Sequence, residues 1–219
     1  MPEGRDSRKG RANGAESRRR ILAAAREVAG ERGYDGTSIS LVSERCGLPA
    51  SSIYWHFANK DALIAAVLEE SFGVWVRSVA IPTDAAGSPV EWGTALAMGT
   101  ARALRDSPEF LRVGLMLALE RRPAERSVAR ATFHKLRDIG YNRITEFVTT
   151  LAPEADAETV ALFATYAIAA ADGLFLAAET RGDEIDLEKL FAFHAKILME
   201  SLARHISSAA PVPPPSPER

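Results

Sequence analysis

Three large side chains that combine a flat apolar ring with a polar atom stand in a row at Tyr54, Trp55 and His56, and Ser51 and Ser52 shortly precede them. Hydroxyl and imidazole groups form hydrogen bonds with phosphate oxygens and base edges, and an aromatic ring contacts a thymine methyl group. This combination of residue types is therefore typical of a surface that binds nucleic acid.

The apolar positions around this run predict a short helix. Ile53 and Phe57 lie four residues apart and form one stripe, which leaves the serines and the three aromatic residues around the rest of the helix. Another short helix precedes it, with Thr37 and Ser38 as N-cap candidates and Gly47 at its end. Two short helices joined by a glycine turn form a helix-turn-helix, whose second helix enters the major groove of DNA.

Two further interpretations concern the same region. Lys60 stands at the start of the next expected helix, where its ammonium group can meet the DNA backbone. The alternative for Tyr54 and Trp55 is packing between helices, which is common for aromatic side chains. We expect one of the three adjacent aromatic residues to pack in this way.

The segments on either side complete an N-terminal domain. From Ser17 onward, apolar residues such as Ile21 and Val28 recur at helical spacing, and the helix is expected to stop at Gly33 in a left-handed C-cap. Residues 1–14 are rich in Arg, Gly and Ser, and residues 208–219 are rich in Pro, so both ends are expected to be disordered.

The stretch from Ile21 to Leu63 resembles the DNA-binding domain of TetR-family (TetR/AcrR) transcriptional regulators. It contains, in order, the entry motif "GYDGTS", the turn glycine, the motif "YWHF" and the helix start "NKDAL". The resemblance implies that Thr37 or Ser38 contacts the DNA backbone. It also implies an operator-facing surface made of Ser51, Ser52, Tyr54, Trp55, His56 and Lys60. Ala29, Gly30 and Pro49 depart from the family pattern, but proline fits a first helical turn.

The remainder of the chain keeps a helical rhythm without strand signals. Further helices are expected at 59–79, 90–105, 108–120, 127–151, 157–180 and 186–206. The predicted fold is all-α with about nine helices: a three-helix DNA-binding head and a helical ligand-binding and dimerisation body. The predicted domains are a basic arm at 1–14, the head at 15–62, the body at 63–207 and a tail at 208–219.

The resemblance also implies a homodimer in which the last two helices of each subunit pair as a four-helix bundle. Symmetry agrees, because a two-fold dimer places two recognition helices on two half-sites. The alternative is that the apolar stripes form the core of a single subunit. The interface candidates are Leu174, Leu187, Leu190, Phe191, His194, Ile197 and Leu198.

A small-molecule effector, partly apolar and bound among the helices of the body, is a further implication of the family. In such regulators the effector shifts the fourth helix and changes the distance between the recognition helices. The candidate lining residues are Trp92, Met98, Arg102, Met116, Glu120, Phe133, His134, Tyr141, Phe163, Tyr166 and Asp172. Most of them are expected to be ordinary packing or surface residues.

Motifs of catalysis are missing from the sequence. It contains no glycine-rich phosphate loop, no G-x-S-x-G, no H-E-x-x-H and no cysteine pair, so no enzyme activity and no cofactor are predicted. His134 and Asp138 lie four residues apart, but no third ligand accompanies them, so no metal site is predicted. The single cysteine, Cys46, is expected to be a small buried residue.

Composition and charge agree with a DNA-binding regulator. The chain has 219 residues, 47% of them hydrophobic, and no signal peptide or uninterrupted apolar run long enough for a membrane span, so a cytoplasmic protein without a membrane partner is expected. Residues 1–60 carry 11 Lys/Arg against 7 Asp/Glu, whereas residues 61–219 carry 16 against 22. A basic end on an acidic body favours a polyanion as the partner of the N-terminal part.

The predicted function is that of a homodimeric repressor which a small molecule releases from a palindromic double-stranded DNA operator. The alternative is an architectural DNA-binding protein, or one controlled by a protein partner, without a small-molecule effector. The basic arm suits that alternative through phosphate neutralisation or contact with the minor groove.

Overall fold

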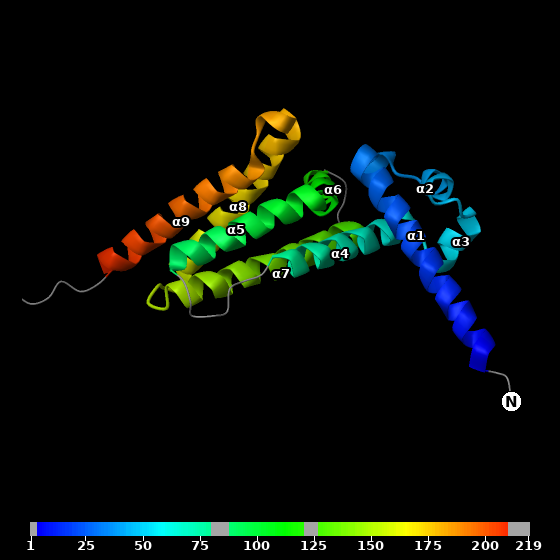
Figure 1. The fold of residues 1–219 in the computed structure, drawn as a ribbon, viewed down its shortest axis with the longest axis horizontal. Helices are drawn as coiled ribbons and strands as arrows, with labels where there is room; N and C mark the ends of the chain where they lie inside the picture. Colours follow the sequence, from blue (N-terminus) through cyan, green and yellow to red (C-terminus); the bar gives the residue numbers. More distant parts are fainter. Residues whose placement is uncertain (1–3, 80–87, 121–126, 210–219) are drawn as a thin grey trace, which may run out of the picture. The chain divides into compact units, whose positions relative to one another are not determined.

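The computed structural model describes residues 4–79, 88–120 and 127–209, and these ranges are helical with no strand (Figure 1). The predicted all-α fold is confirmed. The helices are α1 (Gly4–Gly36), α2 (Ile39–Cys46), α3 (Ala50–His56), α4 (Lys60–Ser78), α5 (Pro89–Asp106), α6 (Glu109–Leu119), α7 (Val128–Leu151), α8 (Ala157–Arg181) and α9 (Leu187–Ala209), with a short 3-10 turn η2 (Gly182–Glu184) before α9. From α2 to α8 each bound lies within about two residues of its prediction.

The described part of the N-terminal arm is helical, so the prediction of disorder up to residue 14 is wrong from Gly4 onward. The helix propensities of arginine, alanine and glutamate offset the cost of isolated glycines, each of which destabilises a helix by about 1 kcal/mol relative to alanine. The helix breaks at Gly33, whose φ of 67° and ψ of −174° form a kink before it resumes to Gly36. Residues 1–3 and 210–219, and with them most of the predicted tail, lie outside the described residues.

Two compact units divide the chain, and the division does not fall at residue 62 as predicted. One unit contains Met1–Arg77 and Ala103–Asp138, and the other contains Ser78–Arg102 and Ile139–Arg219. The predicted head therefore shares its unit with α4, α6 and the first half of α7. The reason is packing, because α6 contacts α1 and the start of α7 bonds to the start of α4.

Helices α1, α2 and α3 bury one common core. Its larger members include Ile21, Val28, Val42, Ile53 and Leu63, all between 0% and 2% exposed. Burial of each such side chain contributes about 1.5–3 kcal/mol, so this cluster fixes the three helices against one another. Cys46 lies in the same core, as predicted.

The ends of α2 are set by local hydrogen bonds. The Ser38 side chain accepts a hydrogen bond from the backbone N–H of Leu41 at 3.2 Å, which confirms Ser38 as the N-cap. Gly47 adopts the left-handed conformation with φ 64°, and its N–H bonds to the carbonyl of Glu44. Pro49 then precedes α3 in an extended conformation and occupies the N-cap instead of the first helical turn.

Helix α6 packs on α1 through glycines. The Arg112 guanidinium donates to the Gly30 carbonyl at 3.1 Å, and the Met116 side chain lies where a Cβ of Gly33 would stand. On the other side of α6, the ring of Phe133 from α7 covers Gly114. The Phe133 ring also lies beside the Phe110 ring, tilted by 52° and with 5.4 Å between the ring centroids. At position 114 any Cβ would overlap the Phe133 ring, whereas at position 33 it is the φ of 67° that favours glycine, since the Met116 methyl group is the flexible end of its side chain and can shift.

Asp61, at the start of α4, joins three elements of the same unit. Its Oδ1 accepts hydrogen bonds from the Tyr34 hydroxyl and the Ser127 hydroxyl, each at 2.9 Å. Its Oδ2 accepts from the backbone N–H groups of Val128 and Ala129 at the start of α7. A carboxylate here satisfies otherwise unpaired N–H groups and stabilises the positive end of the helix dipole. Burial and then the bond to Asp61 raise the pKa of Tyr34 to about 12, which keeps its hydroxyl a donor.

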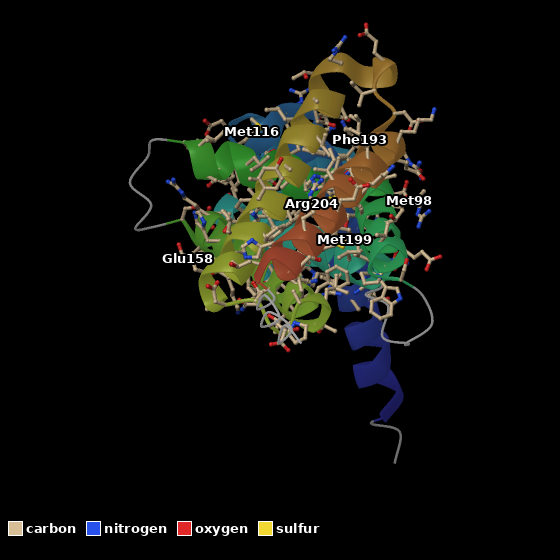
Figure 2. All side chains as sticks on the ribbon, turned by 90° about the vertical axis from the view of Figure 1, so that its left-hand side faces the viewer. Met98, Met116, Glu158, Phe193, Met199 and Arg204 are labelled. Atoms are coloured by element: carbon tan, nitrogen blue, oxygen red, sulfur yellow. The ribbon has the colours of Figure 1, made fainter. Side chains whose placement is uncertain are left out.

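The second unit contains the pair α8 and α9. Val148, Ala152, Val160 and Leu202 form a core between α7, α8 and α9. The Asp156 side chain caps α8 by accepting from the N–H of Thr159 at 2.8 Å. Met199, labelled on α9 in Figure 2, is buried and lies against Gly93 of α5.

We predict that Gly114→Ala lowers the free energy of unfolding by about 1–3 kcal/mol, the usual cost of overpacking a core. A Cβ at this position would stand 2.0 Å from the nearest ring carbon of Phe133. The matched control is Gly140→Ala, in the middle of α7, where a Cβ meets nothing within 4 Å. That variant should gain up to about 1 kcal/mol from helix propensity. Thermal unfolding measures both, and equal effects of the two variants would contradict the described packing of α6 on α7.

Candidate DNA-binding surface

Helix α3 presents one buried and one exposed side. Ile53 is fully buried and Phe57 nearly so, as their spacing predicted, whereas Tyr54 is 56% exposed and Trp55 is 76% exposed. Ser51 is exposed as well. The packing alternative is therefore wrong for Tyr54 and Trp55, whose rings lie largely in solvent. A large exposed aromatic pair is unusual unless a partner covers it.

Ser52 and His56 lie at the margin of this exposed side and are half-buried. The His56 ring meets the Trp55 ring edge-on, with 4.5 Å between centroids. His56 is thus the one of the three adjacent aromatic residues that packs most. Burial, and then the positive charge of Arg18, lower its pKa below the ordinary value of 6.5, so its imidazole is neutral at pH 7.

Thr37 does not belong to this surface, contrary to the prediction. It is 2% exposed, and its hydroxyl donates to the Gly33 carbonyl at 2.7 Å. Ser38 is exposed, but its oxygen already caps α2. The two adjacent hydroxyls therefore have different roles. The Thr37 hydroxyl bonds to the backbone at the Gly33 kink of α1, and the Ser38 hydroxyl caps α2.

Lys60 is held by Tyr34. Its ammonium nitrogen donates to the Tyr34 carbonyl at 3.0 Å and lies 4.2 Å from the centre of the Tyr34 ring. An ammonium group has three donors, so two remain after this bond. Lys60 therefore combines a structural contact with the predicted capacity to bind a phosphate.

Several other cations of the head are also engaged in internal contacts. Arg20 donates to the Cys46 carbonyl at the end of α2 at 2.7 Å, and Arg45 pairs with both Glu27 and Glu31 at 3.0 Å. Arg18 differs, because its guanidinium lies over the Phe57 ring, 5.3 Å from the centroid, beside α3. The sequence indicates only that residues 1–60 are basic as a whole, and the position of Arg18 beside α3 becomes visible only in the structure.

The predicted effector residues fall in both compact units. In the first, Phe133 is buried in the core against Gly114, and Met116 lies against α1. Glu120 ends α6, and His134 is exposed. In the second unit, Trp92, Met98, Tyr141, Phe163 and Asp172 are half-buried, whereas Arg102 and Tyr166 are exposed.

The predicted interface residues divide in a similar way. Phe191 and Leu198 are buried within the single chain, which corrects their assignment to the interface. Leu174, Leu187, Leu190 and His194 are half-buried, and Ile197 is 41% exposed. Burial lowers the pKa of His194, whose ring lies 6.2 Å from that of Tyr166 on α8.

Helix α8 exposes an apolar stripe that sequence analysis did not single out. Leu162, Tyr166 and Leu176 are each more than half exposed. Ala169 and Gly173 stand between them on the same helical face and are also exposed. By length and composition α8 is apolar enough to cross a membrane, and only 17% of its most apolar window is buried. Most of this apolar window is therefore left uncovered in the single chain.

Metal ligands do not gather in the described ranges, where no group of three or more His, Cys, Asp or Glu side chains is close enough to hold an ion. His205 of α9 instead lies against α8, with its Nε2 3.2 Å from the Thr159 hydroxyl oxygen.

Comparison with known proteins matches this surface to one family. Residues 21–67 match the family described as bacterial regulatory proteins, tetR family. The chain is 38% identical over 52 residues to the HTH-type transcriptional regulator UidR of Escherichia coli, covering 24% of this chain and 26% of UidR. It is 31% identical over 104 residues to the class A tetracycline repressor protein of transposon 1721 from Escherichia coli, covering 47% of this chain and 45% of that repressor. The match thus spans about a quarter of UidR and less than half of the tetracycline repressor.

The fold as a whole has structural relatives. The fatty acid degradation regulator FadR from Bacillus halodurans superposes with a TM-score of 0.67 over 84% of this chain and 93% of FadR, at 19% sequence identity. Taken with α2, the glycine turn and α3, the family match defines residues 21–67 as a helix-turn-helix DNA-binding domain. Residues 21–67 are therefore a DNA-binding domain of the tetR family.

We expect operator affinity to rise as pH falls from about 7.5 to about 5.5, across the ordinary histidine pKa of about 6.5. In the free protein the pKa of His56 lies below that value. A nearby phosphate favours the charged imidazolium, so the pKa of His56 is higher in the complex and binding takes up a proton.

The measurement is the operator dissociation constant as a function of pH, by fluorescence anisotropy at constant salt. His56→Gln keeps a polar side chain without a titrating group and should flatten the curve. The same pH dependence in His56→Gln would show that another group titrates and that His56 does not approach a phosphate.

Proposed function

We propose that this protein is a homodimeric repressor that binds a palindromic DNA operator through α3 and leaves it when a small molecule binds the helical body. The observation that carries the proposal is the exposed side of α3, where Tyr54 and Trp55 lie in solvent beside Ser51. The opposite side of the helix is fixed in the core by Ile53 and Phe57. A rigid helix with a polar-aromatic outer face suits insertion into the major groove.

The outer face of α8 supports the dimer. Leu162, Tyr166 and Leu176 flank Ala169 and Gly173, and a Cβ at Gly173 would meet nothing within 4 Å in the single chain. Small residues at the middle of an apolar stripe allow two helices to approach closely. On α9, Phe193 is 63% exposed, and Figure 2 labels it on the same helix as Met199 and Arg204. A second copy of the chain would bury these side chains in a bundle of four helices.

The effector proposed for the body is a small, partly apolar molecule. The second unit offers mixed apolar and polar side chains that are only partly covered, among them Trp92, Tyr141 and Asp172. Such a mixture suits a ligand with an apolar body and a few polar groups. Binding to DNA in a bacterial cell places the proposed protein in the cytoplasm.

We predict that Tyr54→Ala and Ser52→Ala change which bases are preferred at particular operator positions, each costing about 1–3 kcal/mol on the preferred sequence. Lys60→Gln should instead weaken all sequences similarly and reduce the salt dependence of binding by about one unit of slope. Binding of a panel of single-base operator variants distinguishes the two patterns. Because Lys60 also bonds to Tyr34, the melting temperature of Lys60→Gln must be measured alongside. Uniform losses for all three variants would contradict the assignment of α3 as the base-reading helix.

We predict that Leu176→Glu converts the dimer into monomers. A carboxylate in an apolar interface costs about 3 kcal/mol or more per subunit, and the two copies in a dimer together raise the dissociation constant at least ~10,000-fold. The matched control is Leu119→Glu on α6, because Leu119 is 80% exposed and lies away from α8 and α9 in the chain order. Sedimentation velocity should find a monomer for the first variant and a dimer for the second. A dimer in both cases would show that the outer face of α8 is not the interface.

A further inference from the structure

The positive charges of the head are unequally available for DNA. Arg19 pairs with Glu16 at 2.6 Å, Arg20 caps α2, and Arg45 is held by two glutamates. The Lys60 ammonium group already donates one hydrogen bond to the Tyr34 carbonyl. A cation that already has a carboxylate beside it adds less net positive charge to the surface that a polyanion meets.

Arg18 is exposed and has a different environment. Its guanidinium covers the Phe57 ring, and no carboxylate pairs with it among the described residues. The stacking contact immobilises the group beside α3 without neutralising its charge. The same charge helps to lower the pKa of His56, which places it close to the outer side of α3.

The part of α1 before Arg18 runs next to the same end of α3. A Cβ at Gly14 would lie 3.6 Å from two ring carbons of Trp55, in ordinary van der Waals contact. Gly14 and Arg18 are four residues apart and therefore share one face of α1. The helix extends a further ten residues to Gly4, about 15 Å at 1.5 Å per residue. The sequence places four Lys/Arg and two Asp/Glu in residues 1–12.

We propose that the N-terminal half of α1 is a second DNA-binding element, which contacts the phosphate backbone flanking the bases that α3 reads. Arg18 is its fixed cation, and the helical arm before Gly14 extends the contact along the duplex. The proposal rests on the function proposed for α3. It follows from the proximity of the Gly14 backbone to the Trp55 ring, because a duplex that covers the exposed ring comes close to the start of this arm.

The test is the salt dependence of operator binding by the full-length protein. Arg18→Gln should reduce the slope of log K against log salt by about one per subunit, and deletion of residues 1–12 should reduce it by about two to four, since each phosphate contact contributes about 0.9. Arg18→Lys should retain the wild-type slope. Arg45→Gln is the matched control and should also retain it, because its charge is already compensated by Glu27 and Glu31.

Unchanged slopes in both Arg18→Gln and the deletion would overturn the proposal. The preferred base sequence should be the same in every variant, because phosphate contacts carry no sequence information. Circular dichroism of each variant establishes that the fold is retained. Failure of the wild-type protein to bind any duplex specifically would refute the function proposed for α3 instead, so the two failures are distinguishable.

A second measurement locates the partner on the DNA. Neutral methylphosphonate linkages are placed outside the half-sites, and affinities are compared for the wild-type protein and the 1–12 deletion carrying Arg18→Gln. The modified duplex should weaken wild-type binding at least several-fold and leave the combined variant unaffected. Equal weakening of both proteins, or of neither, would show that α1 does not bind the flanking phosphates.

Discussion

The burial of one face of α1 is the constraint on which the rest of the first unit depends. Ile21, Ala25 and Val28 fix α2 and α3 against it, and the glycines near its end receive α6. The same helix therefore holds α3 in place and connects it to α6. Because packed helices shift as rigid elements, we expect a displacement of α6 to reach α3 through α1.

The junction at Asp61 gives that connection a polar component. One carboxylate accepts hydrogen bonds from Tyr34 after the kink in α1, from Ser127, and from the N-terminus of α7. Such a junction is stable only when all its donors are aligned with the carboxylate, because leaving a buried donor without an acceptor costs about 1–3 kcal/mol of folding free energy. Helix α7 runs on from this junction into the second unit, so the start of a body helix and the start of α4 are held by the same side chain.

Sequence periodicity predicted the bounds of the helices well, but it predicted less well which side chains tertiary packing buries. The bounds of α2 and α3 followed from Ser38, Gly47 and the Ile53 and Phe57 spacing, which are local signals. Thr37 shows the limit, since its neighbour Ser38 has the same chemistry and only the kink at Gly33 decides which hydroxyl is buried. Phe133 and Phe191 looked like pocket and interface residues, but tertiary packing covers them. The helical arm was missed because its glycines and serines indicate a loop, while the continuity of α1 depends on helix-forming residues on both sides of them.

The central claim is that an exposed polar-aromatic helix face, held by α1, reads a symmetric DNA sequence. The most direct measurement is selection of binding sites from a random duplex pool by the purified protein at fixed, near-physiological salt, followed by sequencing. The account predicts enrichment of an inverted repeat, with its two halves separated by about one helical turn of DNA, 34–36 Å, or a multiple of it. Retention of duplexes without any enriched sequence, or no retention at all, would contradict it.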